Sequence, residues 1–87
     1  MNNYYIVFNS ITFATRVKRF FLGDGSDIGL LHTPKSIPVN GCSYSLRTRK
    51  EKTGEILAAA EELGIKTKGV FIENNGEFEG VADDLFR

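Results

Sequence analysis

The sequence predicts an α+β fold in which two amphipathic helices pack on one face of a four-stranded antiparallel sheet. Two observations lead to this prediction. Short runs of aromatic and β-branched residues alternate with longer segments whose apolar residues recur every three or four positions. The 87 residues, of which 41% are apolar, fit one small domain over residues 1–87. A domain of this size buries roughly 60% of the surface that its unfolded chain exposes.

The opening residues predict a strand followed by a helix. Tyr4–Phe8 is a short aromatic and β-branched run, and Asn9 and Ser10 after it are residue types that cap helices. An apolar stripe with helical spacing then continues until Gly23. We expect this stripe to face the sheet; it consists of Phe13, Ala14, Val17, Phe20 and Phe21.

Two further strands are predicted in the middle of the chain. Residues 28–33 form an apolar run that stops at Pro34, which lacks the N–H needed in a sheet. Residues 43–49 alternate, with Tyr44, Leu46 and Thr48 on one face. The segment 34–41 would join these strands as a hairpin.

A second helix and a fourth strand complete the pattern. The helix is expected to open at Lys52 or Thr53 and to end at Gly64, with a buried stripe of Ile56, Leu57, Ala60 and Leu63. Residues 68–73 form the fourth strand. The remainder either turns back as a hairpin through the pair Asn75-Gly76 or continues as an acidic tail.

The order strand, helix, strand, strand, helix, strand is that of the ferredoxin-like βαββαβ fold. In this fold the second and third strands pair as a hairpin. His32 and Thr33 should therefore lie close to Cys42 and Ser43, with Cys42 at the end of a loop.

Charge and hydropathy argue against a nucleic-acid-binding protein and against a membrane protein. The formal net charge is zero, which argues against a strongly basic nucleic-acid binder. Residues 1–50 carry a net charge of +5, whereas residues 51–87 carry −5, so Cys42 lies in the positive half. No apolar run approaches the ~20 residues of a membrane-spanning helix, and no secretory segment precedes the first strand. We expect a cytoplasmic protein without membrane partners.

Cys42 is the only cysteine, so it cannot form an internal disulfide or complete a cysteine-based zinc site. One cysteine, one histidine and scattered carboxylates predict neither a metal nor a cofactor. Lys35 and Arg47 would lower the pKa of the thiol from about 8.5 and favour a nucleophilic role. The alternative is a small buried apolar side chain on the side of Tyr44. His32 alone favours a polar strand end over a catalytic base.

The chain resembles the selenium/sulfur carrier protein-like family of small prokaryotic domains. The resemblance rests on the opening strand with Asn9-Ser10 and its helix, on Gly69-Val70-Phe71, and above all on the segment 34–42, Pro-Lys-Ser-Ile-Pro-Val-Asn-Gly-Cys. The family pattern carries over onto Pro34, Lys35, Gly41 and Cys42. Ser43 stands where the family has glycine.

The resemblance implies a non-enzymatic carrier that holds sulfur or selenium as a persulfide or perselenide on Cys42. Donor and acceptor proteins would be its partners, and Pro34, Lys35, Gly41, His32 and Arg47 would support the thiol. The alternative is a non-catalytic protein-interaction module. In that case a homodimer forms across the open sheet face, where Val7 and Phe71 would be exposed.

Overall fold

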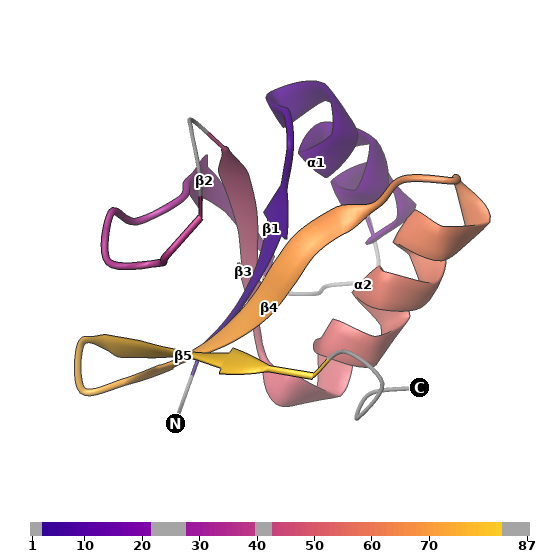
Figure 1. Ribbon diagram of the computed structural model, residues 1–87. Coiled ribbons are helices and arrows are strands. Elements are labelled where there is room, and N and C mark those ends of the chain that lie inside the picture. The colour runs from indigo at the N-terminus through magenta and orange to yellow at the C-terminus, as the bar shows by residue number, and fades with distance from the viewer. Residues whose placement is uncertain (1–2, 22–27, 40–42, 83–87) are drawn as a thin grey trace.

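The computed structural model describes residues 3–21, 28–39 and 43–82, and it shows an α+β fold (Figure 1). The predicted order of two helices among four strands is confirmed, and a further strand follows. The elements are β1 (Tyr4–Phe8), α1 (Ile11–Lys18), the 3₁₀ turn η1 (Arg19–Phe21), β2 (Gly29–His32), β3 (Tyr44–Thr48), α2 (Lys50–Glu62), β4 (Thr67–Asn74) and β5 (Glu77–Val81).

The sheet has five strands in the order β2-β3-β1-β4-β5, and each neighbouring pair is antiparallel. The prediction of a four-stranded ferredoxin-like sheet is therefore wrong in its strand count. The fifth strand arises because Asn75 and Gly76 both adopt positive φ, at 52° and 84°, as a tight hairpin turn requires. Of the two alternatives for this region, the hairpin is confirmed.

Helix α1 begins as expected but buries a narrower stripe than expected. The hydroxyl of Ser10 accepts a hydrogen bond from the Phe13 amide at 3.3 Å, which caps the helix. Ala14 and Val17 are fully buried, whereas Phe13 and Phe20 are 38% and 54% exposed. The prediction that both phenylalanines face the sheet is wrong, because α1 turns its side with the smaller residues inward.

Helix α2 begins at Lys50, before the predicted start. Thr53 lies inside the first turn, where its hydroxyl donates to the carbonyl of Arg49 at 3.0 Å. The predicted end is confirmed. Gly64 adopts φ 72°, and the amides of Gly64 and Ile65 bond back to carbonyls of the last helical turn.

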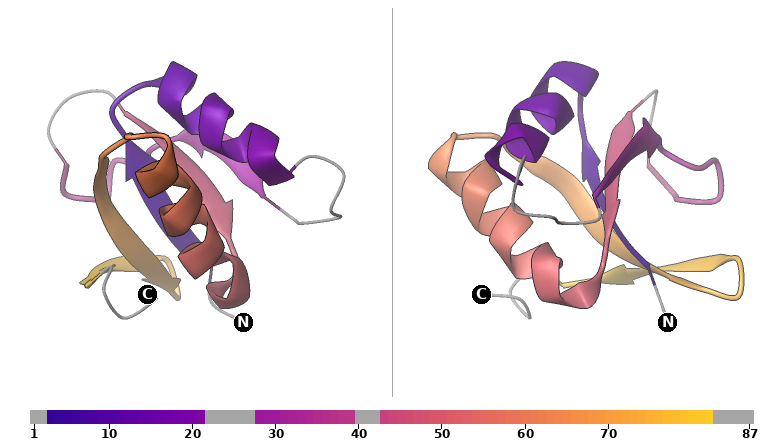
Figure 2. Two further views of the ribbon diagram at one scale, coloured as in Figure 1. Left: turned by 90° about the vertical axis from the view of Figure 1, so that its right-hand side faces the viewer. Right: turned by 180° about the vertical axis from the view of Figure 1, so that it is seen from behind.

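Both helices cover the same face of the sheet (Figure 2). This face holds the larger of two apolar clusters. Its fully buried strand residues include Ile6, Phe8 and Leu46, and α2 contributes Ile56. The helices and this face together form the main core.

The opposite face of the sheet is also covered. The loop after β2 and the β4–β5 hairpin lie on this side (Figure 1), and they bring Ile37 and Phe78 against Tyr5, Val7 and Phe71. Val7 is fully buried and Phe71 is 9% exposed. The prediction of an open face with these two residues exposed is wrong, because the chain folds its own loop over them.

Candidate functional site

The end of the β2–β3 hairpin holds three of the six predicted site residues, His32, Pro34 and Lys35. His32 pairs with Tyr44, and the Thr33 amide donates to the Ser43 carbonyl at 3.0 Å. The predicted proximity of Thr33 to Ser43 is thus confirmed. Gly41 and Cys42 lie outside the described residues. Ser43, which follows Cys42 in the sequence, is buried.

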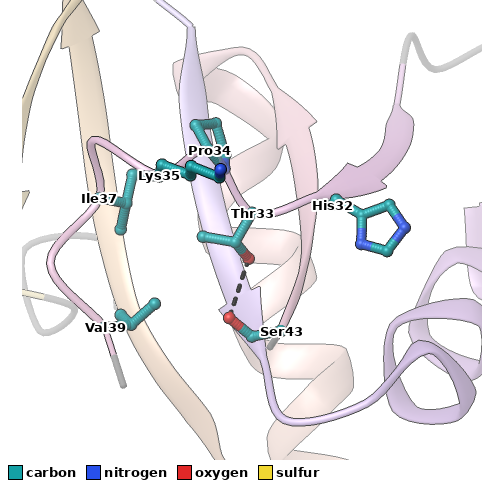
Figure 3. Close-up of a pocket in the computed structure, with 7 residues that line it drawn as sticks. All are labelled: His32, Thr33, Pro34, Lys35, Ile37, Val39 and Ser43. Carbon is teal, nitrogen blue, oxygen red and sulfur yellow. Dashed lines mark hydrogen bonds between the residues drawn. The ribbon is translucent and has the colours of Figure 1, made fainter. Parts of the chain in front are cut away.

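A pocket of about 450 Å³ lies beside this hairpin end (Figure 3). Three predicted site residues, His32, Pro34 and Lys35, line it. The sequence predicted Thr33 and Ser43 only as neighbours of the site, and it gave Ile37 and Val39 no role. The described lining is His32, Thr33, Pro34, Lys35, Ile37, Val39 and Ser43.

Three hydroxyls join the two strands at the pocket. Ser43 donates to Thr33 Oγ1 at 3.1 Å, and Thr33 Oγ1 lies 2.8 Å from Ser45 Oγ. Ser45 is fully buried. The alternation of strand residues places Ser43 and Ser45 on one face, which the sequence indicated, but their contact with Thr33 depends on the hairpin register.

The loop is shaped by short-range backbone hydrogen bonds. The Ile37 amide donates to the Pro34 carbonyl at 3.0 Å, and the Val39 amide donates to the Ile37 carbonyl at 2.9 Å. These bonds fold the loop back over the sheet. Ile37, which is 3% exposed, thereby packs against Tyr5, Val7 and Phe71 on the sheet face opposite the helices. Lys35, at the turn, remains exposed.

His32 has a packing contact of its own. Its ring lies 4.4 Å from the ring of Tyr44, measured between centroids. Figure 3 shows the imidazole directed away from Ile37 and Val39, so that it borders the pocket on the side opposite these residues. His32 is the last residue of β2 and remains exposed beside this ring contact.

Arg47 lies away from the pocket. It pairs with Tyr5 and Gly29, and four residues of strand, roughly 13 Å, separate it from Ser43. Its guanidinium contacts the position of Gly29, where a Cβ would lie 3.4 Å from Nη2. The predicted role of Arg47 beside Lys35 therefore finds no match in the described lining.

Arg47 instead belongs to a cluster around Tyr5. The Tyr5 hydroxyl donates to a Glu73 carboxylate oxygen at 3.2 Å. Burial raises the pKa of Tyr5 above 10.0, the charge of Glu73 and this hydrogen bond add to the rise, and Arg47 opposes it. This cluster joins residues of β1, β3 and β4 at the centre of the sheet.

In residues 3–21, 28–39 and 43–82, no group of three or more His, Cys, Asp and Glu side chains is placed to hold a metal ion. Within the same ranges, neither helix has the length and apolar character needed to cross a bilayer.

The comparisons with curated proteins and with solved structures gave no match. Residues 3–72 match the sequence model of a family described as "Putative Se/S carrier protein-like". The matched span runs from the residue before β1 into β4 and contains both helices and the segment 34–42; β5 lies beyond it. Because the match covers most of the 87 residues, the chain belongs to the Se/S carrier protein-like family.

Proposed function

We propose that the protein is a non-enzymatic carrier that holds sulfur or selenium on Cys42. Membership of the Se/S carrier protein-like family is the observation that carries the proposal. Carriage of a sulfane sulfur or selenium atom needs a nucleophilic thiol, and Cys42 is the only thiol of the chain.

The chemistry is a simple exchange. The Cys42 thiolate attacks the outer sulfur of a donor persulfide, R–S–SH, and the S–S bond of the donor breaks. A new S–S bond forms between Cys42 and the outer sulfur. The leaving thiolate R–S⁻ takes the proton of that outer sulfur, so the products are R–SH and the Cys42 persulfide anion. Attack by an acceptor thiolate on the carried sulfur reverses these steps. Selenium would be carried in the same way as a perselenide.

The surroundings of the motif support this role. Lys35 is exposed at the turn and supplies positive charge, which favours a thiolate or persulfide anion. Pro34 accepts the hydrogen bond that shapes the loop, and Gly41 precedes the thiol in the motif. His32 lies at the same hairpin end. Donor and acceptor proteins in a reducing cytoplasm complete the proposal.

Intact-mass analysis tests the proposal. Protein purified without reductant, and then incubated with a small-molecule persulfide, should gain the mass of one sulfur atom on the Cys42 peptide. Reductant should remove that mass, and Cys42→Ser should never acquire it. A wild-type Cys42 that is unmodified after purification and still unmodified after incubation with the persulfide would contradict the carrier proposal.

A second candidate function is a protein-interaction module. The sheet face predicted to form a homodimer is covered by the chain itself. A module that dimerises through this face is therefore not proposed. A different surface supports the module. Ile11, Phe13 and Phe20 are exposed along α1 and η1, next to the exposed Arg16 and Arg19.

A further inference from the structure

The pocket at the β2–β3 hairpin has two chemically different sides. Ile37 and Val39 provide apolar side chains on one side, as Figure 3 shows, while the hydroxyls of Thr33 and Ser43 lie between them and His32. None of the described lining residues is acidic. The pocket therefore offers both an apolar wall and polar donors to one ligand.

The hydroxyl hydrogen bonds leave one donor unused. Ser45 is fully buried, and within the described part of the chain Thr33 is the partner of its hydroxyl. Either hydroxyl can donate in the Thr33–Ser45 bond, but the arrangement in which Ser45 donates is the one that gives its proton an acceptor among the described residues, and Ser43 also donates to Thr33. Both lone pairs of Thr33 Oγ1 are then occupied. Its own proton remains for an acceptor in the pocket that Thr33 lines.

The charge of the lining favours an anionic acceptor. Lys35 is exposed at the rim of the pocket, and no carboxylate among the described residues forms an ion pair with it. A lysine ammonium and a free hydroxyl donor together suit a carboxylate or a similar oxyanion.

The size of the pocket indicates that the anion carries an organic part. About 450 Å³ is far more space than a lone oxyanion fills, and it lies in the range of small-molecule sites. Ile37 and Val39 would gain by covering an apolar chain. We propose that this pocket binds a small organic anion, a carboxylate or similar oxyanion with a short apolar chain.

Nuclear magnetic resonance titration of the full chain tests the inference with three probes. Hexanoate has both the anion and the chain, acetate has only the anion, and hexanol has only the chain. Hexanoate should shift the amides of Thr33, Lys35, Val39 and Ser43 in a saturable way. It should bind at least about tenfold more tightly than acetate, because burial of about two methylene groups suffices for that factor.

A matched pair of lysine variants tests the anion contact. Lys35→Glu should weaken hexanoate binding about tenfold or more and leave hexanol binding unchanged, because it reverses one charge at the rim. Lys50→Glu makes the same change at an exposed lysine of α2 and should bind hexanoate like the wild type. Both sites are exposed, so neither variant should disturb the fold.

Four results would overturn the inference. They are an absence of saturable shifts, shifts that map to α1 or β5 instead of the pocket, acetate or hexanol binding as tightly as hexanoate, and equal losses in the two lysine variants. The carrier proposal would survive each of them, since it depends on sulfur exchange at Cys42 and none of these measurements follows that exchange.

Discussion

At the scale of single residues, Thr33 is the junction of the hairpin end. Its hydroxyl forms hydrogen bonds with Ser43 and with Ser45, and Ser45 is fully buried. Thr33→Val keeps the shape of the side chain and removes the hydroxyl. We expect a loss of about 1–3 kcal/mol in the free energy of unfolding, because buried hydroxyls are left without a partner.

A double-mutant cycle by chemical denaturation measures this junction. Adding Ser45→Ala to Thr33→Val should recover part of the lost free energy of unfolding, because the double variant no longer buries a Ser45 hydroxyl without a partner. Thr12→Val, at an exposed position of α1, serves as the control and should change stability little. Strictly additive losses in the double variant would show that the hydroxyls act independently.

Tyr5 should lose its phenolic proton at a higher pH than an ordinary tyrosine, because burial and Glu73 raise its pKa. As the pH rises past 10.0, the unfolded chain loses this phenolic proton before the folded chain does. The stability contributed by neutral Tyr5 is therefore complete below that pH and falls above it. The tyrosinate absorbance of wild type minus that of Tyr5→Phe should appear above pH 10. A midpoint at or below the ordinary tyrosine value would contradict this.

At the scale of elements, α1 separates buried from exposed apolar residues. Val17→Ala should destabilise the protein by about 2 kcal/mol, because it leaves a cavity under the helix. Phe20→Ala should cost less than about 1 kcal/mol, since this ring is 54% exposed. Denaturant unfolding of both variants decides the orientation of α1. A larger loss at Phe20 would place the aromatic stripe against the sheet.

The β4–β5 turn depends on backbone conformation at Gly76. Gly76→Ala should destabilise by about 1–2 kcal/mol, because φ 84° is unfavourable for a residue with a Cβ. Gly80→Ala is the matched control on β5. A Cβ there would meet Phe71 at 3.7 Å, an ordinary contact. Thermal unfolding should separate the two variants, and equal melting temperatures would mean that the turn does not set the stability of the hairpin.

At the scale of the whole molecule, the chain covers both faces of its own sheet. Val7 and Phe71 are buried by the loop and by the hairpin, so they offer no dimer surface. We expect light scattering at micromolar concentration to give the mass of one chain. A dimer that dissociates in Phe20→Glu would contradict this and would place an interface on the exposed side of α1.

Local signals in the sequence determined the elements and several of their ends. Ser10 was a recognisable N-cap, Gly64 ends α2 in a left-handed conformation, and Asn75-Gly76 makes the hairpin turn. Each of these signals acts within a few residues, so it can be read without knowing the fold. The segment 34–42 likewise indicated the family, which the match over residues 3–72 confirms.

Tertiary structure decided which faces are covered and which side chains meet. Alternation along β1 placed Tyr5 and Val7 on one face, but only the folded loop shows that Ile37 covers it. The stripe of α1 could face the sheet in two neighbouring orientations, and packing selected Ala14 and Val17. Thr33 meets Ser45 only through the hairpin register. These contacts join residues distant in sequence, which periodicity does not encode.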